Sequence, residues 1–133
     1  MPINFDSALG IHADAIRIRS QRAELLASNL ANVDTPNYKA RDIDFQAALK
    51  MATSGQSDHI NTTHKKHFPT SGGGDSFSPA LLYRTPLQDS LDGNTVDEQI
   101  EQSAFMQNAI QYQVSLDFLG GKFRSLRTAI KGE

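Results

Sequence analysis

The C-terminal part of the chain carries an uninterrupted apolar repeat, which constrains the fold more than any other feature of the sequence. Its members recur at alternating spacings of four and three residues and none is polar, a pattern typical of a helix that presents one seam to a partner. We call them the apolar seam: Phe105, Ala109, Tyr112, Leu116, Leu119, Phe123, Leu126 and Ile130. The repeat predicts a helix over residues 96–130, about 50 Å long, in an elongated molecule.

Both ends of this expected helix carry charge that suits its dipole. Thr95 and Glu98 have the spacing of a capping box, so we expect the helix to begin there. Acidic residues occupy the first turns, and four basic residues lie near the end: Lys122, Arg124, Arg127 and Lys131. Gly120 and Gly121 interrupt the pattern and leave two interpretations, a close approach or bend of a continuous helix, or a break in the helix.

The N-terminal part predicts a second long helix over residues 5–33. Its own seam matches only in part, with His12 and Arg19 at seam positions beside the apolar residues Phe5, Leu9, Ile16, Ala23, Leu26 and Leu30. A neighbouring stripe indicates contact with more than one element: Ile11, Ala15, Ile18 and Leu25. We therefore expect a mainly α fold in which the two terminal helices pair as a coiled-coil-like unit.

The middle of the chain differs in composition from both ends. Residues 51–78 are rich in Ser, Gly and Thr and predict a flexible loop, while apolar residues return over 79–91 and predict a short strand or extended segment. This divides the chain into an N-terminal helix over 1–34, a loop-rich middle over 35–94 and a C-terminal helix over 95–133. The two terminal segments would together form an inner helical core.

Composition excludes several classes of function. A net charge of −2 argues against nucleic-acid binding, and the absence of cysteine excludes disulfides, thiolate nucleophiles and Cys-ligated metals. We find no cleavable secretory signal and no apolar stretch long enough to insert into a membrane. Asp42 and Asp44 have no partner base or nucleophile, so we expect no enzyme, no cofactor and no small-molecule substrate.

A metal site is the one catalytic alternative that the sequence offers. His59, His64 and His67 cluster with Asp58, but their spacing matches no established site and polar residues surround them. We therefore predict no functional metal. The competing hypothesis of a metal-dependent enzyme would require bound metal after dialysis.

The most distinctive segment is residues 27–38, which read Ala-Ser-Asn-Leu-Ala-Asn-Val-Asp-Thr-Pro-Asn-Tyr. Pro36 disfavours helical geometry at Thr35, so the first helix should stop there, with Pro36 and Asn37 at the centre of a turn. Asn29 and Asn32 could bond the carbonyls that a helix end leaves free. On physical grounds alone this is an ordinary helix stop.

The same segment resembles the N-terminal signature of bacterial flagellar rod and hook proteins. Residues 39–45, 90–97 and 112–121 extend the likeness to the basal-body rod protein family, and within it to the proximal members. The signature residues are Asn29, Asn32, Thr35, Pro36, Tyr38, Asp92, Gly93, Asn94, Val96 and Asp97. At Asn37 the family usually has glycine, and because asparagine also reaches the left-handed region we expect the turn to survive.

The resemblance implies a structural subunit that polymerises into the proximal rod, linking the membrane ring and export gate to the distal rod. Implied partners are further copies, other rod proteins, the adaptor FliE, the membrane ring and the export gate. It also implies a periplasmic rod subunit exported by the flagellar type III apparatus without a cleaved signal, and residues 5–9 are a candidate recognition element.

We expect assembly to use apolar positions of both terminal helices: Phe5, Leu9, Ile16, Leu26, Leu30, Phe105, Tyr112, Leu116, Leu119, Phe123, Leu126 and Ile130. The alternative is a cytoplasmic coiled-coil adaptor or export chaperone that binds a partner helix without polymerising.

Overall fold

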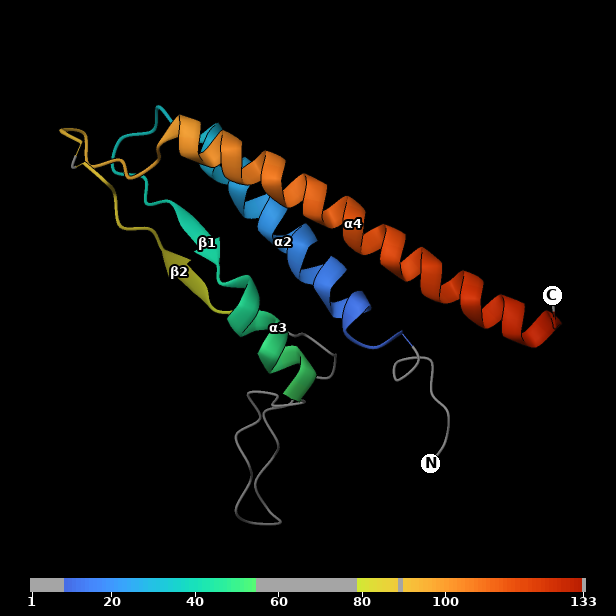
Figure 1. The fold of residues 1–133 in the computed structure, drawn as a ribbon. Coiled ribbons are helices and arrows are strands. Elements are labelled where there is room, and N and C mark those ends of the chain that lie inside the picture. The colour runs from blue at the N-terminus through green and yellow to red at the C-terminus, as the bar shows by residue number, and fades with distance from the viewer. Residues whose placement is uncertain (1–8, 55–78, 89, 133) are drawn as a thin grey trace, which may run out of the picture.

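The computed structural model describes residues 9–54, 79–88 and 90–132 (Figure 1). Within these residues, three helices and two strands follow one another: α2 (Ile11–Ala31), β1 (Arg41–Ile43), α3 (Phe45–Ser54), β2 (Leu81–Tyr83) and α4 (Glu98–Lys131). The expectation of a mainly α fold with a short β segment in the middle is confirmed.

The two long helices lie side by side along the molecule (Figure 1). They are antiparallel, because Asn29 near the end of α2 bonds Glu101 near the start of α4, while His12 near the start of α2 contacts Phe118 far along α4. The predicted pairing of the terminal helices is therefore confirmed. Of the residues described, no helix is both long and apolar enough to cross a bilayer.

The first long helix is shorter than predicted at its start. Gly10 precedes α2 with φ 55° and ψ −142°, a conformation that favours glycine and interrupts the helix expected to run on from Phe5. Phe5 itself lies outside the described residues. At the other end α2 stops at Ala31, before the Thr35 boundary that Pro36 predicted.

The second long helix begins and continues differently from the prediction. Asp97 caps it, accepting hydrogen bonds from the backbone N of Gln99 and Ile100, so the proposed cap at Thr95 is wrong. Thr95 is occupied elsewhere, because its hydroxyl oxygen accepts from the Ala40 backbone N. α4 continues unbroken through Gly120 and Gly121, so a break is wrong, and no backbone approaches either glycine within 4 Å of where a Cβ would lie.

Helix α3, which follows β1 after a single residue, was not expected from the sequence. Asp44 caps it by accepting from the backbone N of Gln46 and Ala47, and its last residues occupy positions assigned to the flexible loop. The loop prediction is thus wrong at 51–54, and the rest of that loop, 55–78, lies outside the described residues.

A small apolar core lies where α2, β1 and α3 meet. Ile18, Ile43 and Ala48 form its buried centre, and three partly buried residues surround it: Leu25, Phe45 and Leu49. The second stripe of the N-terminal helix, which includes Ile18 and Leu25, thus contacts neighbours other than α4, as predicted.

β1 and β2 form an antiparallel two-stranded ribbon beside the helix pair, with Asp42 opposite Leu82 (Figure 1). All three residues of β2 are exposed. The ribbon is therefore held mainly by contacts at its β1 side and its ends.

Candidate functional site

The two signature segments, far apart in the sequence, meet at the end of α2. The Asn94 side-chain amide donates to the backbone carbonyls of Asn32 and Val33, at 3.0 and 2.6 Å. These carbonyls lie just beyond α2, where no further helical turn can satisfy them. Asn94 is buried and therefore joins the start of the C-terminal segment to the end of the N-terminal helix.

The turn after α2 has the predicted form. The Tyr38 backbone N donates to the Thr35 carbonyl at 3.3 Å, so Pro36 and Asn37 occupy the central positions. Asn37 has a φ of 61°, which confirms the expected left-handed conformation. Its backbone N donates to the Asp92 carbonyl at 2.9 Å, which joins the turn to the second signature segment.

Gly93 is required at this meeting point. It has a φ of 72°, and a Cβ at this position would lie 2.7 Å from the Asn37 side-chain oxygen. The Lys39 ammonium donates to the Gly93 carbonyl, and the Thr95 backbone N donates to the Tyr38 carbonyl. The signature thus encodes two loops that fit against each other.

Asn29 and Asn32 have different roles from one another. Asn32 donates to the Ser28 carbonyl at 2.7 Å, the helix-end contact that its position predicted. Asn29 is fully buried and instead pairs with the Arg41 backbone, donating to its carbonyl at 2.8 Å and accepting from its N at 3.2 Å. Asn29 therefore fixes strand β1 against α2.

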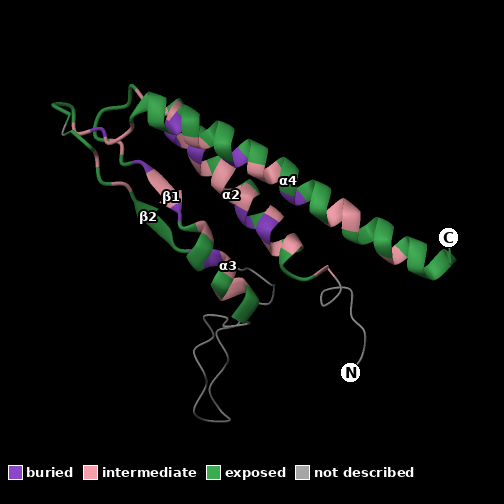
Figure 2. Ribbon diagram, in the orientation of Figure 1, coloured by how far each residue is buried: buried purple, intermediate pink, exposed green. Residues whose placement is uncertain are grey.

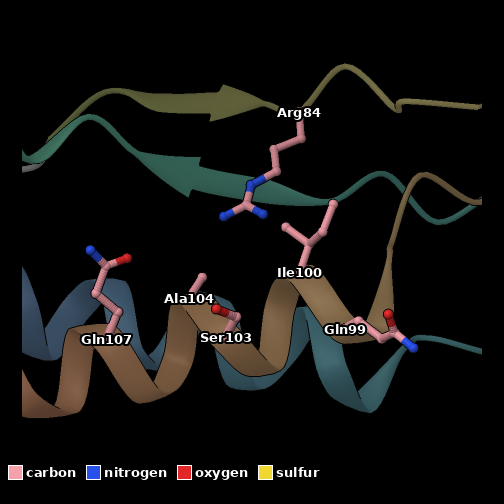
Figure 3. Close-up of a pocket in the computed structure, with 6 residues that line it drawn as sticks. All are labelled: Arg84, Gln99, Ile100, Ser103, Ala104 and Gln107. Carbon is pink, nitrogen blue, oxygen red and sulfur yellow. The ribbon is translucent and has the colours of Figure 1, made fainter.

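Four charged side chains form a connected junction between the helices and the ribbon, which we call the charged junction: Arg22, Asp42, Arg84 and Glu101. The Arg22 guanidinium donates two hydrogen bonds to the Asp42 carboxylate, at 2.8 and 2.9 Å. Arg84 joins Asp42 at 2.6 Å and Glu101 at 2.8 Å. Figure 3 shows Arg84 reaching from the end of β2 toward α4.

The electrostatics of the junction favour its ionised state. Burial raises the pKa of Asp42, but hydrogen bonds from Arg22 and Arg84 outweigh this effect and hold the pKa below its ordinary value. The hydrogen bond to Asp42 raises the pKa of Arg22. Glu101 is only 1% exposed and completes its pairing with a bond from Asn29 at 3.1 Å.

The charged junction was missed in the sequence because each member had a simpler explanation. Glu101 suited the helix dipole, and Asp42 had no visible partner. One signal was present: Glu101, Asn108 and Ser115 recur every seven residues, a polar heptad beside the apolar seam.

The polar heptad is the face of α4 that packs against α2. These three are the residues of α4 that are buried among those described. Asn108 donates to the Arg19 carbonyl at 2.9 Å, and the Arg19 guanidinium donates to Gln111 at 2.5 Å while its other side covers the Phe45 ring. Specific hydrogen bonds therefore align the two helices.

The apolar seam contributes to this pairing only in part, because its members are half-buried or exposed and none is among the buried residues of α4 that the structure describes. Phe105, Leu116, Phe123 and Ile130 are 37%, 38%, 46% and 86% exposed. The reason is rotational: neighbouring residues of a helix differ by about 100°, so a helix that turns Glu101 toward Asn29 must turn the seam partly away. Tyr112, Leu119 and Leu126 are half-buried.

Figure 2 shows that buried positions concentrate on α2, whereas most of α4 is exposed. Besides the seam, α4 exposes four further apolar residues: Met106, Ile110, Val114 and Phe118. On α2, Leu26 is buried while Ile16 and Leu30 are half-buried, and Leu9, which precedes α2, is also half-buried. The candidate site is thus a wide apolar face of α4, held in place by the charged junction and the two signature loops.

The described part of the chain contains no group of three residues able to hold a metal ion. Asp58 and the three nearby histidines, His59, His64 and His67, lie outside it.

Comparison with known proteins gives concordant results. A family model described as flagella basal body rod protein matches residues 10–39. The chain is similar to the flagellar basal body rod protein FlgB of Aeromonas hydrophila, with 50% identity over 100% of this chain and 99% of that protein. It is 46% identical to FlgB of Cereibacter sphaeroides, over 97% of this chain and 98% of that protein. It is 40% identical to FlgB of Escherichia coli K12, over 95% and 94% respectively.

Proposed function

Because the chain belongs to the flagellar basal body rod protein family and is a structural subunit of the rod, we propose that it assembles through the exposed apolar face of α4. The observation that carries this proposal is that large apolar side chains remain exposed on a helix whose buried face is polar. Fully burying one such side chain contributes about 1.5 to 3 kcal/mol. Neighbouring subunits that cover this face would gain that stabilisation repeatedly.

We further propose that two parts of the subunit occupy different positions in the rod. Residues 1–34 and 95–133 form the inner helical core of the rod, and the ribbon and α3 within 35–94 form an outer arm. The side-by-side arrangement of α2 and α4, with the ribbon and α3 lying beside α2, supports this division. The charged junction fixes the angle between core and arm.

The place of the subunit in the flagellum is part of the same proposal. The subunit belongs to the proximal rod in the periplasm and leaves the cell by the flagellar type III apparatus without a cleaved signal. Its partners are further copies, other rod proteins, FliE, the membrane ring and the export gate, and it has no catalytic role. Similarity to rod proteins over the whole chain supports this placement and disfavours an adaptor or chaperone.

The direct test places a charge on the apolar face. Leu116→Asp and Phe123→Asp each introduce a carboxylate where the free subunit already meets solvent, so each variant should fold. In the rod the same carboxylate would be buried without a partner, so we expect loss of rod assembly and of swimming motility. Electron microscopy of basal bodies measures rod assembly, and circular dichroism of the purified variants checks their helix content.

The matched control is Gln46→Asp, which introduces the same charge at an exposed position of α3, outside the apolar face of α4. It should leave motility near the level of the unmodified protein. Normal motility in the Leu116→Asp strain would count against the proposed assembly face.

A further inference from the structure

The last part of α4 extends beyond the helix that it pairs with. α2 begins at Ile11, and the ring of His12 already contacts Phe118, with 5.9 Å between ring centroids. Residues 120–131, which we call the overhang, therefore continue for about 18 Å past the start of α2. Figure 1 shows this stretch reaching the C-terminus with no other described element beside it.

The overhang is strongly basic. Residues 118–132 contain four cations and no acidic residue: Lys122, Arg124, Arg127 and Lys131. Because the whole chain has a net charge of −2, the remainder carries −6 once these four are set apart. All four are exposed, and none forms an ion pair with any residue that the structure describes.

The cations border an apolar stripe. Phe123, Leu126 and Ile130 recur at spacings of three and four residues, so they share one side of the helix. At about 100° per residue, Arg124, Arg127 and Lys131 lie together along one edge of that stripe. This narrow stripe with a charged edge matches a protein surface that combines apolar and acidic side chains better than a lipid surface, which selects a wide apolar face.

The opposite end of the same molecule carries the opposite charge and an exposed apolar side chain. Where the signature loops meet the start of α4, four carboxylates are exposed beside a single cation, Lys39: Asp34, Asp92, Asp97 and Glu98. Leu91 is fully exposed among them. A subunit of this fold therefore presents an acidic end with an apolar side chain and a basic end with an apolar stripe.

We propose that the overhang binds the acidic end of a neighbouring rod subunit, a surface where an apolar side chain is bordered by carboxylates. This rests on the proposed function, because it requires neighbouring subunits. A contact between unlike ends is heterologous, and where the rotation from one subunit to the next does not close a ring it generates an open helical polymer. Charge complementarity at such a contact also excludes wrong partners, since like charges repel.

The test reverses the charge of the overhang in the full-length chain. Arg124→Glu combined with Arg127→Glu should reduce the number of basal bodies at least tenfold, while Arg124→Lys combined with Arg127→Lys should stay within twofold of the unmodified protein. The control for net charge is Lys50→Glu, at an exposed position of α3, compared with the single variant Arg127→Glu, because each of these two variants changes the net charge by the same amount. Circular dichroism of each purified chain verifies that it folds.

A photo-reactive amino acid in place of Thr128 then identifies the molecule that contacts the overhang in purified basal bodies. We expect a cross-linked peptide from a rod subunit, this chain or another, with a carboxylate within one helical turn of the cross-link. Changing that carboxylate to lysine should restore assembly of the charge-reversed variant. A cross-link to lipid, to residues 1–8 of the same chain or to a peptide without carboxylates would overturn the proposal.

The two sets of variants distinguish an error in the overhang contact from an error in the proposed function. If charge reversal leaves basal bodies unchanged while Leu116→Asp abolishes them, the overhang contact is wrong and the assembly face stands. If Leu116→Asp also assembles normally, both are wrong.

Discussion

Glu101 illustrates how one buried carboxylate can determine the arrangement of several segments. Its two oxygens meet Arg84, which follows β2, and Asn29, which holds β1. The same side chain turns one face of α4 toward α2. A single residue thus sets which face of α4 remains exposed.

Removing this carboxylate should be costly. Glu101→Ala leaves Arg84 and Asn29 short of a partner at a buried position, so we expect the free energy of unfolding to fall by about 3 kcal/mol. Glu98→Ala, at an exposed position three residues earlier, should change it by less than about 0.5 kcal/mol. Urea denaturation measures both, and equal effects of the two substitutions would contradict the role assigned to Glu101.

Two glycine substitutions should have opposite effects. Gly93→Ala forces a side chain into a left-handed conformation and places its Cβ 2.7 Å from the Asn37 oxygen, so we expect a loss of at least about 1 kcal/mol. Gly120→Ala meets nothing within 4 Å in the middle of α4 and should increase stability by up to about 1 kcal/mol. Thermal denaturation of the two variants tests this, and a stabilising Gly93→Ala would disprove the close approach.

The charged junction should make stability depend on pH. The pKa of Asp42 is lower in the folded protein than its ordinary value of 3.8, so its contribution is complete above that pH and is lost as the pH falls through the folded value. We therefore expect the stability difference between the unmodified protein and Asp42→Asn to narrow below about pH 4. Urea denaturation over a series of pH values measures the difference. If the stability difference between the two proteins stayed constant with pH, the pKa of Asp42 would be the same in the folded and unfolded protein, which would contradict this prediction.

At the scale of the elements, the sequence predicted which helices exist better than which faces they bury. The apolar repeat predicted α4 to within two residues at each end, because a heptad pattern over many turns suits only a helix. It did not reveal the buried face, because pairing depends on Asn29, Arg84 and other residues distant in sequence. Buried polar contacts of this kind leave no periodic apolar signal.

The helix starts show a similar limit. Thr95 and Asp97 are both good cap residues, and local propensity does not separate them. In the folded protein the Ala40 backbone N donates to the Thr95 hydroxyl oxygen, so Thr95 is not available as a cap. Asp97 caps α4 instead. α3 was missed because its sequence ends in Ala, Thr and Ser, which merge with the polar segment that follows.

The cap assignment predicts an effect on α4 as an element. Asp97→Ala removes the acceptor for the backbone N of Gln99 and Ile100, so we expect a loss of about 1 kcal/mol. Asp117→Ala, in the middle of α4 and exposed, removes a carboxylate that caps nothing and should have little effect. Chemical denaturation followed by circular dichroism distinguishes the two, and a neutral Asp97→Ala would disprove the cap.

At the scale of the whole molecule, antiparallel pairing brings the start of α2 beside the second half of α4. The absence of native cysteine allows this pairing to be tested by joining His12→Cys to Phe118→Cys, whose native rings are in contact, with a short bifunctional thiol reagent that fills the space of the two rings. The cross-link should form in the folded protein and stabilise the chain by about 2 to 4 kcal/mol, because it closes a very long loop.

The comparison pair is His12→Cys with Gln113→Cys, which places the second cysteine at an exposed position of α4. Unfolding with and without the reagent measures the effect, and only the first pair should be stabilised by the reagent. Failure of the first pair to cross-link in the folded protein would contradict the antiparallel arrangement.

The two sets of contacts made by Asn29 also imply an order of folding. Asn29 meets Arg41 across 12 residues of chain but meets Glu101 across 72. Closing the longer loop costs about 1.6 kcal/mol more chain entropy, so α2, β1 and α3 can condense around Ile18 before α4 arrives. We therefore expect the folding nucleus to lie in the first half of the sequence, and α4 to be the last helix to dock and the first to be released.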